Sequence, residues 1–141
     1  MKKILTLLLV ISSLYLTSCS SDDDNSSGNE YPKTVNIKYD ITTTQYTEAV
    51  VTRTLDNNTQ NDTQTENFDS FPYSHTYVQE EVNEGTYLKL TFMHNLAQTG
   101  GVDDYEAELK ITVGNEVVKS ETFMITDNDL GVTKQIDYTF E

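Results

Sequence analysis

The amino-acid sequence predicts an all-β fold built as an antiparallel sandwich of two sheets. Hydrophobic and polar residues alternate with a period of two along most of residues 34–140, which is typical of half-buried strands. Turn-forming residues interrupt these runs at short, regular spacing, and the region contains no convincing helical pattern. About seven strands of this kind indicate a β-sandwich of immunoglobulin type, although one Cys and no Trp exclude the disulfide and core tryptophan of antibody domains. A small closed barrel is the alternative architecture.

The first part of this region contains two predicted strands and one loop. Residues 34–41 form a strand, and residues 46–55 form a second, β-branched strand whose inward face the pattern leaves open. Residues 56–67 are polar without interruption, and we expect a loop there. The residues predicted to face the core from the first strand are Val35, Ile37, Tyr39 and Ile41.

The next two predicted strands cover residues 73–82 and 86–94, with a turn at residues 83–85 between them. A loop that contains Gly100-Gly101 follows the second strand. In residues 73–82 the alternation separates Tyr73, His75, Tyr77, Gln79 and Glu81 from Ser74, Thr76, Val78, Glu80 and Val82, and in residues 86–94 it places Leu88, Leu90 and Phe92 on one face.

The last strands are predicted at residues 105–113 and 116–126 and around residues 132–140. Gly114-Asn115 is a two-residue hairpin loop of the kind that type II′ turns favour. The predicted inward residues are Tyr105, Ala107, Leu109, Ile111 and Val113 in the first of these strands, Val117, Phe123 and Ile125 in the second, and Val132, Lys134, Ile136, Tyr138 and Phe140 in the third.

Residues 1–18 have the pattern of a cleaved secretory signal peptide. Two lysines precede an apolar stretch that is too short to cross a bilayer comfortably. This stretch ends in Leu16-Thr17-Ser18-Cys19, which resembles the lipobox of bacterial lipoproteins. The resemblance implies cleavage before Cys19 and attachment of the mature protein to membrane lipid through that residue. An uncleaved anchor or an ordinary signal peptide is the alternative.

Residues 19–30 are polar, acidic and rich in serine, so we expect a disordered tether before a β-sandwich domain at residues 31–141. Asp22, Asp23 and Asp24 resemble the acidic patch that follows the lipidated cysteine in Bacteroidetes lipoproteins and marks export to the cell surface. The resemblance implies an outer-membrane lipoprotein at the cell surface, with the periplasmic face of that membrane as the alternative.

The folded region resembles the periplasmic domain of the MmpS transport-accessory family. The resemblance is carried by the opening strand at residues 34–41, by the turn Phe71-Pro72-Tyr73-Ser74, and by the hairpin at residues 105–119. It implies an immunoglobulin-like sandwich that assists a membrane transporter and has no chemistry of its own. Members of that family use an uncleaved transmembrane helix, whereas this chain carries a lipobox.

Charge and composition exclude several classes of function. The net charge is −14, and all 23 acidic residues but only seven of the nine Lys and Arg follow residue 18. We therefore expect no nucleic-acid binding, which needs clustered basic residues. We also expect no cofactor, because two His and one Cys are too few for a transition-metal site. We expect no enzymatic activity, because Ser74 and His75 are neighbours on one strand, point to opposite faces and cannot form a catalytic triad. His75 and His94 are expected to be polar surface or sheet-edge residues.

Two groups of residues remain as candidate sites. Asp127 and Asp129 are weak calcium candidates, and the alternative is that they form a turn by hydrogen bonds to their own backbone. Tyr73, His75 and Tyr77 are candidate ligand-binding residues, because an outward-facing strip of such rings would stack on sugars. The alternative is that these rings line the core with their hydroxyls at its rim.

Two functions follow from these observations. The first is a membrane-anchored lipoprotein with a non-enzymatic accessory or structural role, which binds another protein of the cell envelope. The second is a carbohydrate- or small-ligand-binding module at the cell surface. A glycan binder needs exposed, coplanar aromatic rings, whereas an accessory domain needs an apolar patch or an unprotected strand edge.

Overall fold

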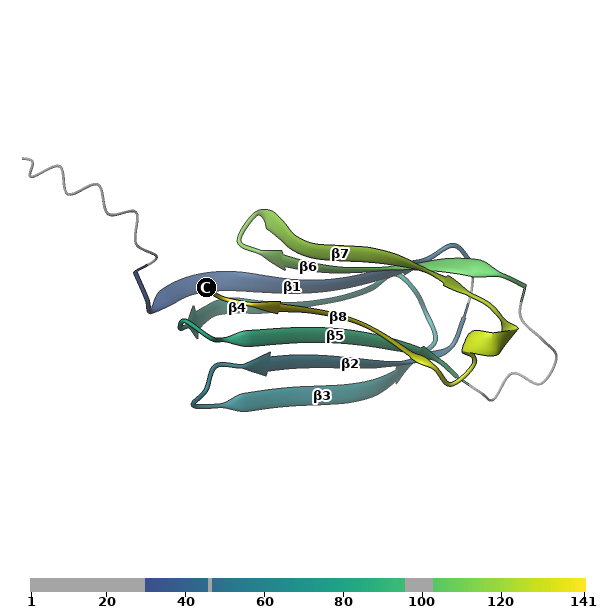
Figure 1. Cartoon of the computed structure of the whole chain (residues 1–141), viewed down its shortest axis with the longest axis horizontal. Coiled ribbons are helices and arrows are strands. Elements are labelled where there is room, and N and C mark those ends of the chain that lie inside the picture. The colour runs from purple at the N-terminus through teal and green to yellow at the C-terminus, as the bar shows by residue number, and fades with distance from the viewer. Residues whose placement is uncertain (1–29, 46, 96–102) are drawn as a thin grey trace, which may run out of the picture.

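Two four-stranded antiparallel sheets pack face to face in the computed structural model of the protein (Figure 1). The structure describes residues 30–45, 47–95 and 103–141. The strand order is β4-β1-β6-β7 in the first sheet and β3-β2-β5-β8 in the second. The predicted two-sheet antiparallel sandwich is confirmed, and it is open rather than closed into a barrel. The described chain has eight strands, one more than expected.

The elements follow one another along the chain with short connections. Their bounds are β1 (Lys33–Thr43), β2 (Ala49–Asp56), β3 (Asn61–Phe68), β4 (Tyr73–Val82), β5 (Tyr87–His94), β6 (Tyr105–Val113), β7 (Glu116–Ile125), a 3-10 turn η1 (Asp127–Asp129) and β8 (Thr133–Thr139). None of the described residues belongs to a helix that is long and apolar enough to cross a bilayer. The predicted signal peptide, Cys19, the acidic residues Asp22 to Asp24, Tyr46 and the loop predicted around Gly100-Gly101 lie outside the described residues.

The core lies between the two sheets and consists mainly of alternate residues from the central strands. The predicted inward face of β5 is confirmed, and those of β1 and β6 are confirmed with Val35 and Val113 only partly buried. The hydroxyl of Tyr39, a fully buried residue of β1, donates a 2.6 Å hydrogen bond across the core to the carbonyl oxygen of Thr54 in β2. The largest fully buried side chains are Tyr39, Phe92, Ile37, Ile41, Leu88, Leu90, Leu109, Ile111, Ile125, Ile136, His94 and Val51.

The prediction of a loop at residues 56–67 is wrong for residues 61–67. Residues 61–68 form β3, which pairs with β2 along its whole length. The connection is confined to residues 57–60, where the side-chain oxygen of Asn57 accepts a 2.8 Å hydrogen bond from the amide of Gln60. β3 is an edge strand of the second sheet, and all of its residues except Asp62 and Phe68 are exposed. Because most of its residues are exposed and the contacts of its inner face are largely polar, β3 needs no hydrophobic alternation.

A bulge in β4 corrects the predicted faces of that strand. Val35 of β1 lies opposite Glu80, and Ile37 lies opposite Tyr77, so that one residue of β1 faces two of β4. Gln79 has a φ of 55°, and its amide donates a 2.9 Å hydrogen bond to the side chain of Asn36. The extra residue brings Glu80 and Val82 to the face that carries Tyr77. The predicted alternation placed them on the opposite face.

A second bulge shifts the start of β7. Ile111 lies opposite Lys119 and Thr112 opposite Val117, which leaves Val118 as the extra residue. Val117, predicted to face inward, is therefore 51% exposed, while Val118 packs against the core. The rest of the predicted inward set of β7 is correct, with Ile125 buried and Phe123 partly buried. In the last segment Ile136 and Phe140 are buried, but Val132 precedes β8 and is 45% exposed.

Candidate binding site at the open edge of the sandwich

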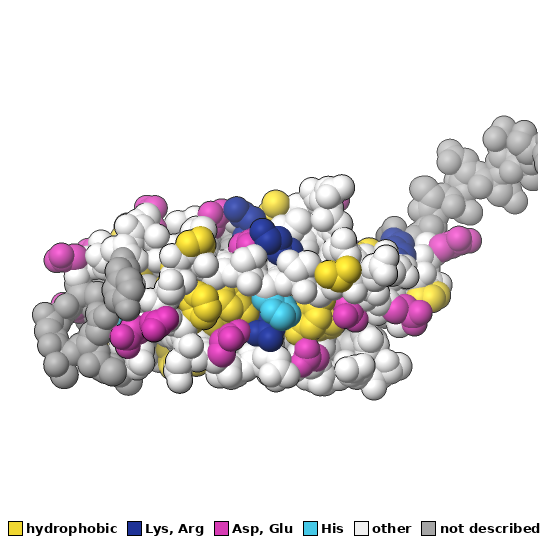
Figure 2. Space-filling model, turned by 180° about the vertical axis from the view of Figure 1, so that it is seen from behind, with side chains coloured by type: hydrophobic (Ala, Val, Ile, Leu, Met, Phe, Trp, Pro, Cys, Tyr) yellow, Lys and Arg dark blue, Asp and Glu magenta, His cyan; other side chains and the backbone are white. Residues whose placement is uncertain are grey.

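Tyr73, His75 and Tyr77 lie together on the face of β4 that points toward the second sheet. Tyr73 is buried, and His75 and Tyr77 are half-buried. β4 and β3 are edge strands of opposite sheets, so these rings line an open edge of the sandwich. Figure 2 shows hydrophobic, histidine, basic and acidic side chains gathered in one band along this side of the molecule. This arrangement corresponds to the alternative given above, in which these rings line the core and place their hydroxyls at its rim.

The aromatic rings of this edge pack with their edges against one another's faces. The ring centroids of His75 and Tyr77 lie 4.8 Å apart, and the angle between the ring planes is 73°. The ring centroids of Tyr77 and Tyr39 lie 6.0 Å apart, with an angle of 77° between the planes. The ring of Tyr73 packs against that of Phe68 in β3, with 5.1 Å between the ring centroids and 90° between the ring planes. Such pairs stabilise the rim of the core, but they present no flat, coplanar surface on which a sugar could stack.

Arg53 of β2 is the centre of a hydrogen-bonded group at this edge. Its Nη1 donates a 2.6 Å bond to Glu66 of β3 and a 3.0 Å bond to the hydroxyl of Tyr73. The Tyr73 hydroxyl donates in turn to the same Glu66 oxygen at 3.1 Å. The Arg53 Nε is buried and has no hydrogen-bond partner among the described residues.

The sequence prediction missed Arg53, although a signal was present. Arg53 is the only arginine of the chain, and it lies between Val51 and Leu55 at an inward position of a strand. A charged residue at such a position requires a partner within reach. That partner is on β3, which the hydropathy pattern did not reveal.

A second pair, Tyr77 and Asp62, lies farther along the same edge. The Tyr77 hydroxyl donates a 2.6 Å hydrogen bond to Asp62 of β3, and Gln64 donates a 2.7 Å bond to the other carboxylate oxygen. These two bonds lower the pKa of the Asp62 carboxyl. Burial, followed by the hydrogen bond to Asp62, raises the pKa of Tyr77 to about 12. Tyr77 is therefore a neutral hydrogen-bond donor at physiological pH.

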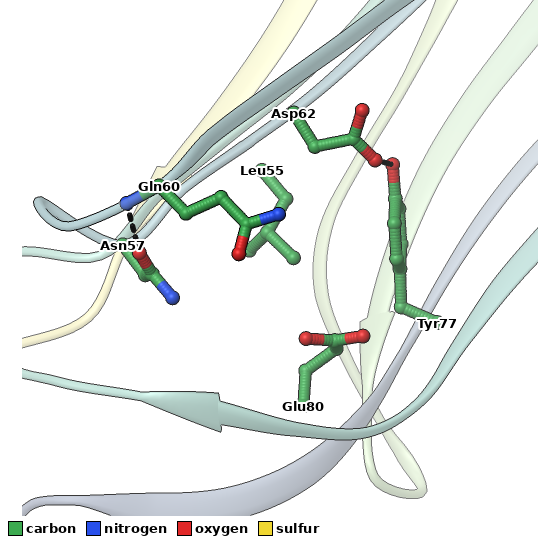
Figure 3. A pocket seen from close by; sticks show the side chains of 6 residues that line it. All are labelled: Leu55, Asn57, Gln60, Asp62, Tyr77 and Glu80. Carbon is green, nitrogen blue, oxygen red and sulfur yellow. Dashed lines mark hydrogen bonds between the residues drawn. The ribbon is translucent and has the colours of Figure 1, made fainter.

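A small cavity of about 70 Å³ lies beside this pair (Figure 3). Leu55 provides an apolar side of the cavity, while carboxylates and side-chain amides provide the others. Glu80, which the β4 bulge turns to this face, is half-buried, and its carboxylate forms no hydrogen bond or ion pair with any described residue. The lining residues are Leu55, Asn57, Gln60, Asp62, Tyr77 and Glu80.

No family model, curated protein or solved structure matches this chain.

The two histidines have different environments. His75 lies half-buried on the edge strand β4, where burial, and then the positive charge of Arg53, lower the pKa of its imidazole. His94 was expected at the surface or at a sheet edge, but it is only 1% exposed. Its Nδ1 lies 2.6 Å from the hydroxyl of Tyr105 and 3.0 Å from that of Thr47. This buried polar group joins β5 to β6 and has the geometry of a structural contact.

The calcium candidates lie in η1, where Asp129 already has partners. Its Oδ2 accepts hydrogen bonds from the amide and the hydroxyl of Thr126, and its Oδ1 lies 2.6 Å from the Lys134 ammonium. These contacts form a capping box with Thr126. No three His, Cys, Asp or Glu side chains of the described chain, Asp127 included, are grouped so that they could hold a metal ion.

We expect the Asp129→Asn variant to lose stability in a pH-dependent way. The contacts with Lys134 and Thr126 lower the pKa of Asp129 to about 2 in the folded protein, below its ordinary value of 3.8. The stabilisation is therefore complete above the ordinary pKa and is lost as the pH falls toward 2. Urea unfolding should show a less stable variant at pH 7 and a difference that shrinks between about pH 5 and 2. A difference of constant size across this range would contradict the assignment.

Proposed function

We propose that this protein is an outer-membrane lipoprotein with a non-enzymatic accessory role, which binds another protein of the cell envelope at the edge between β3 and β4. The anchor is argued from the lipobox at Cys19, and display at the cell surface from Asp22, Asp23 and Asp24. One observation supports the binding site above all: a half-buried, unpartnered carboxylate, Glu80, lines a cavity between two edge strands. A donor on a bound partner would give this carboxylate the charge-assisted hydrogen bond that no described side chain provides.

The size of the cavity favours a protein over a small ligand. Sites for small molecules usually measure about 300–1,000 Å³, whereas this cavity of about 70 Å³ has room for a few water molecules or the end of one side chain. The perpendicular ring pairs at Tyr77 also lack the flat surface that a glycan would use. A carbohydrate-binding role therefore has no specific support at this edge.

The charge of the protein suggests the character of its partner. Asp62, Glu66 and Glu80 lie along this edge, and the whole chain has a net charge of −14. A basic surface would be attracted to such an edge, and an acidic one would be repelled. The resemblance to the MmpS family makes a membrane transporter the partner class to look for first.

Photo-cross-linking from the edge strand β4 tests this proposal. Val78 is 67% exposed and lies two residues before Glu80, so a photoreactive benzoylphenylalanine at this position should capture the partner in native membranes. Val117 is 51% exposed on β7, at the opposite edge of the same sheet, and is the matched control. We expect one dominant protein adduct, identified by mass spectrometry, from position 78 and none from position 117. No adduct from position 78, or equal adducts from both positions, would refute binding at this edge.

A further inference from the structure

We propose that the cavity beside Tyr77 receives the ammonium group of a lysine side chain from the partner protein. This inference rests on the proposed function, because it names the chemical group through which the partner engages the edge. Its starting point is that Glu80 and Asp62 line the same cavity but differ in how their carboxylates are satisfied. Asp62 accepts hydrogen bonds from Tyr77 and Gln64, while Glu80 accepts none from the described residues.

The lining of the cavity supplies acceptors on more than one side. Figure 3 shows the Glu80 carboxylate, the Asp62 carboxylate and the side-chain amide of Gln60 placed around the open space. An ammonium group has three donors that point in different directions, and it can satisfy separate acceptors of this kind. Leu55, which also lines the cavity, provides apolar surface for the methylene groups that precede the ammonium.

The other cations of comparable charge fit the cavity less well. A guanidinium could pair with both oxygens of Glu80, but its planar group is larger than the compact ammonium and has less room in a cavity of about 70 Å³. Calcium requires six to eight oxygen ligands, whereas six residues line the cavity, one of them Leu55, and only two are carboxylates. The cavity is also too small for a whole amino acid or sugar, so the ammonium must arrive at the end of a flexible stem.

The positive charge of Arg53 does not prevent this binding. Arg53 lies on the same inner face as Asp62, but its guanidinium is 2.6 Å from Glu66 and bonds the Tyr73 hydroxyl. Its charge is therefore largely balanced within that group. Glu80 is the carboxylate of this edge that lacks a described partner.

Replacement of Glu80 by glutamine provides a direct test. The variant keeps the size of the side chain and removes its charge. Glu81→Gln is a matched control, because it removes the same charge from the next residue of the strand, whose side chain is exposed. The probe is Nα-acetyl-lysine methylamide, titrated into the full-length protein in detergent and followed by NMR at the side chain of Tyr77. Acetyl-norleucine methylamide, which has an apolar stem without the ammonium, is the control ligand.

We expect the lysine probe, but not the norleucine probe, to shift the Tyr77 resonances. The Glu80→Gln variant should lower the affinity about tenfold or more, because a hydrogen bond to a charged group is lost, and Glu81→Gln should leave it unchanged. No shift at Tyr77, equal losses in both variants, or equal binding of acetyl-arginine methylamide would overturn the assignment to lysine.

The cross-link from position 78 separates this inference from the proposed function. If the adduct forms in the wild-type background and is lost with Glu80→Gln but not with Glu81→Gln, both proposals hold. If the adduct persists with Glu80→Gln, the partner binds this edge without using the cavity, and the lysine inference alone fails. If no adduct forms in any background, the proposed function fails, whatever the result with the lysine probe.

Discussion

Replacement of Cys19 by alanine is expected to abolish lipidation and to remove the protein from the outer-membrane fraction. The resemblance to a lipobox implies that Cys19, the only cysteine of the chain, is the acylated residue. Each buried methylene of an acyl chain contributes about 0.8 kcal/mol to membrane binding, so the loss of several chains leaves nothing comparable to hold a small acidic domain at a membrane. Density-gradient fractionation and the mass of the N-terminal peptide measure both effects.

The neighbouring substitution Ser20→Ala is the control for this experiment. It alters the residue after the proposed cleavage site without removing the thiol, and it should leave both acylation and fractionation as in the wild type. Two results would instead support an uncleaved anchor or an ordinary signal peptide. One is that the Cys19→Ala variant still fractionates with the outer membrane, and the other is that the wild-type N-terminal peptide carries no acyl groups.

The second large effect is expected from Phe92→Ala in the core. Phe92 is fully buried on β5 and lies opposite Val51 of β2. Its ring packs against that of Phe71, with 5.7 Å between the ring centroids. Truncation of a buried phenylalanine to alanine costs about 3–5 kcal/mol, a large part of the roughly 5–15 kcal/mol by which a domain is usually stable. Urea unfolding followed by circular dichroism gives the change in the free energy of unfolding.

Met124→Ala is the matched control for the core. Met124 is a large hydrophobic residue of β7 that is 53% exposed, and its truncation should change the free energy of unfolding by about 0.5 kcal/mol or less. A Phe92→Ala variant within about 1 kcal/mol of the wild type would mean that Phe92 is not the packed centre that its burial indicates.

Hydropathy alternation predicts strands well where one face of the strand is buried and the other is exposed to solvent. This holds for β1, β5 and β6, whose inward residues were predicted from the sequence with little error. It fails for β3, because that edge strand is mostly exposed and carries polar residues on both faces. It also fails locally at Gln79 and Val118, because one extra residue in a bulge reverses the parity of every residue beyond it.

The candidate site was predictable only in part, because its residues come from three strands. Tyr73, His75 and Tyr77 stand out in the sequence as one alternating set on β4. Their partners on β3 could not be assigned while that segment was expected to be a loop. Glu80 was missed for a different reason, since the bulge that turns it toward the cavity leaves no mark in the composition of the strand.

The four edge strands of this open sandwich also affect how copies of the protein meet one another. An unpaired edge invites addition of a strand from a neighbouring molecule, and charged inward residues or bulges prevent it. β3 carries Asp62 and Glu66 on its inner face, β4 is interrupted at Gln79, and β7 carries exposed Lys119 and Glu121. Neighbouring copies should therefore not join through β3, β4 or β7, and a partner at any of these three edges must be held by side-chain contacts.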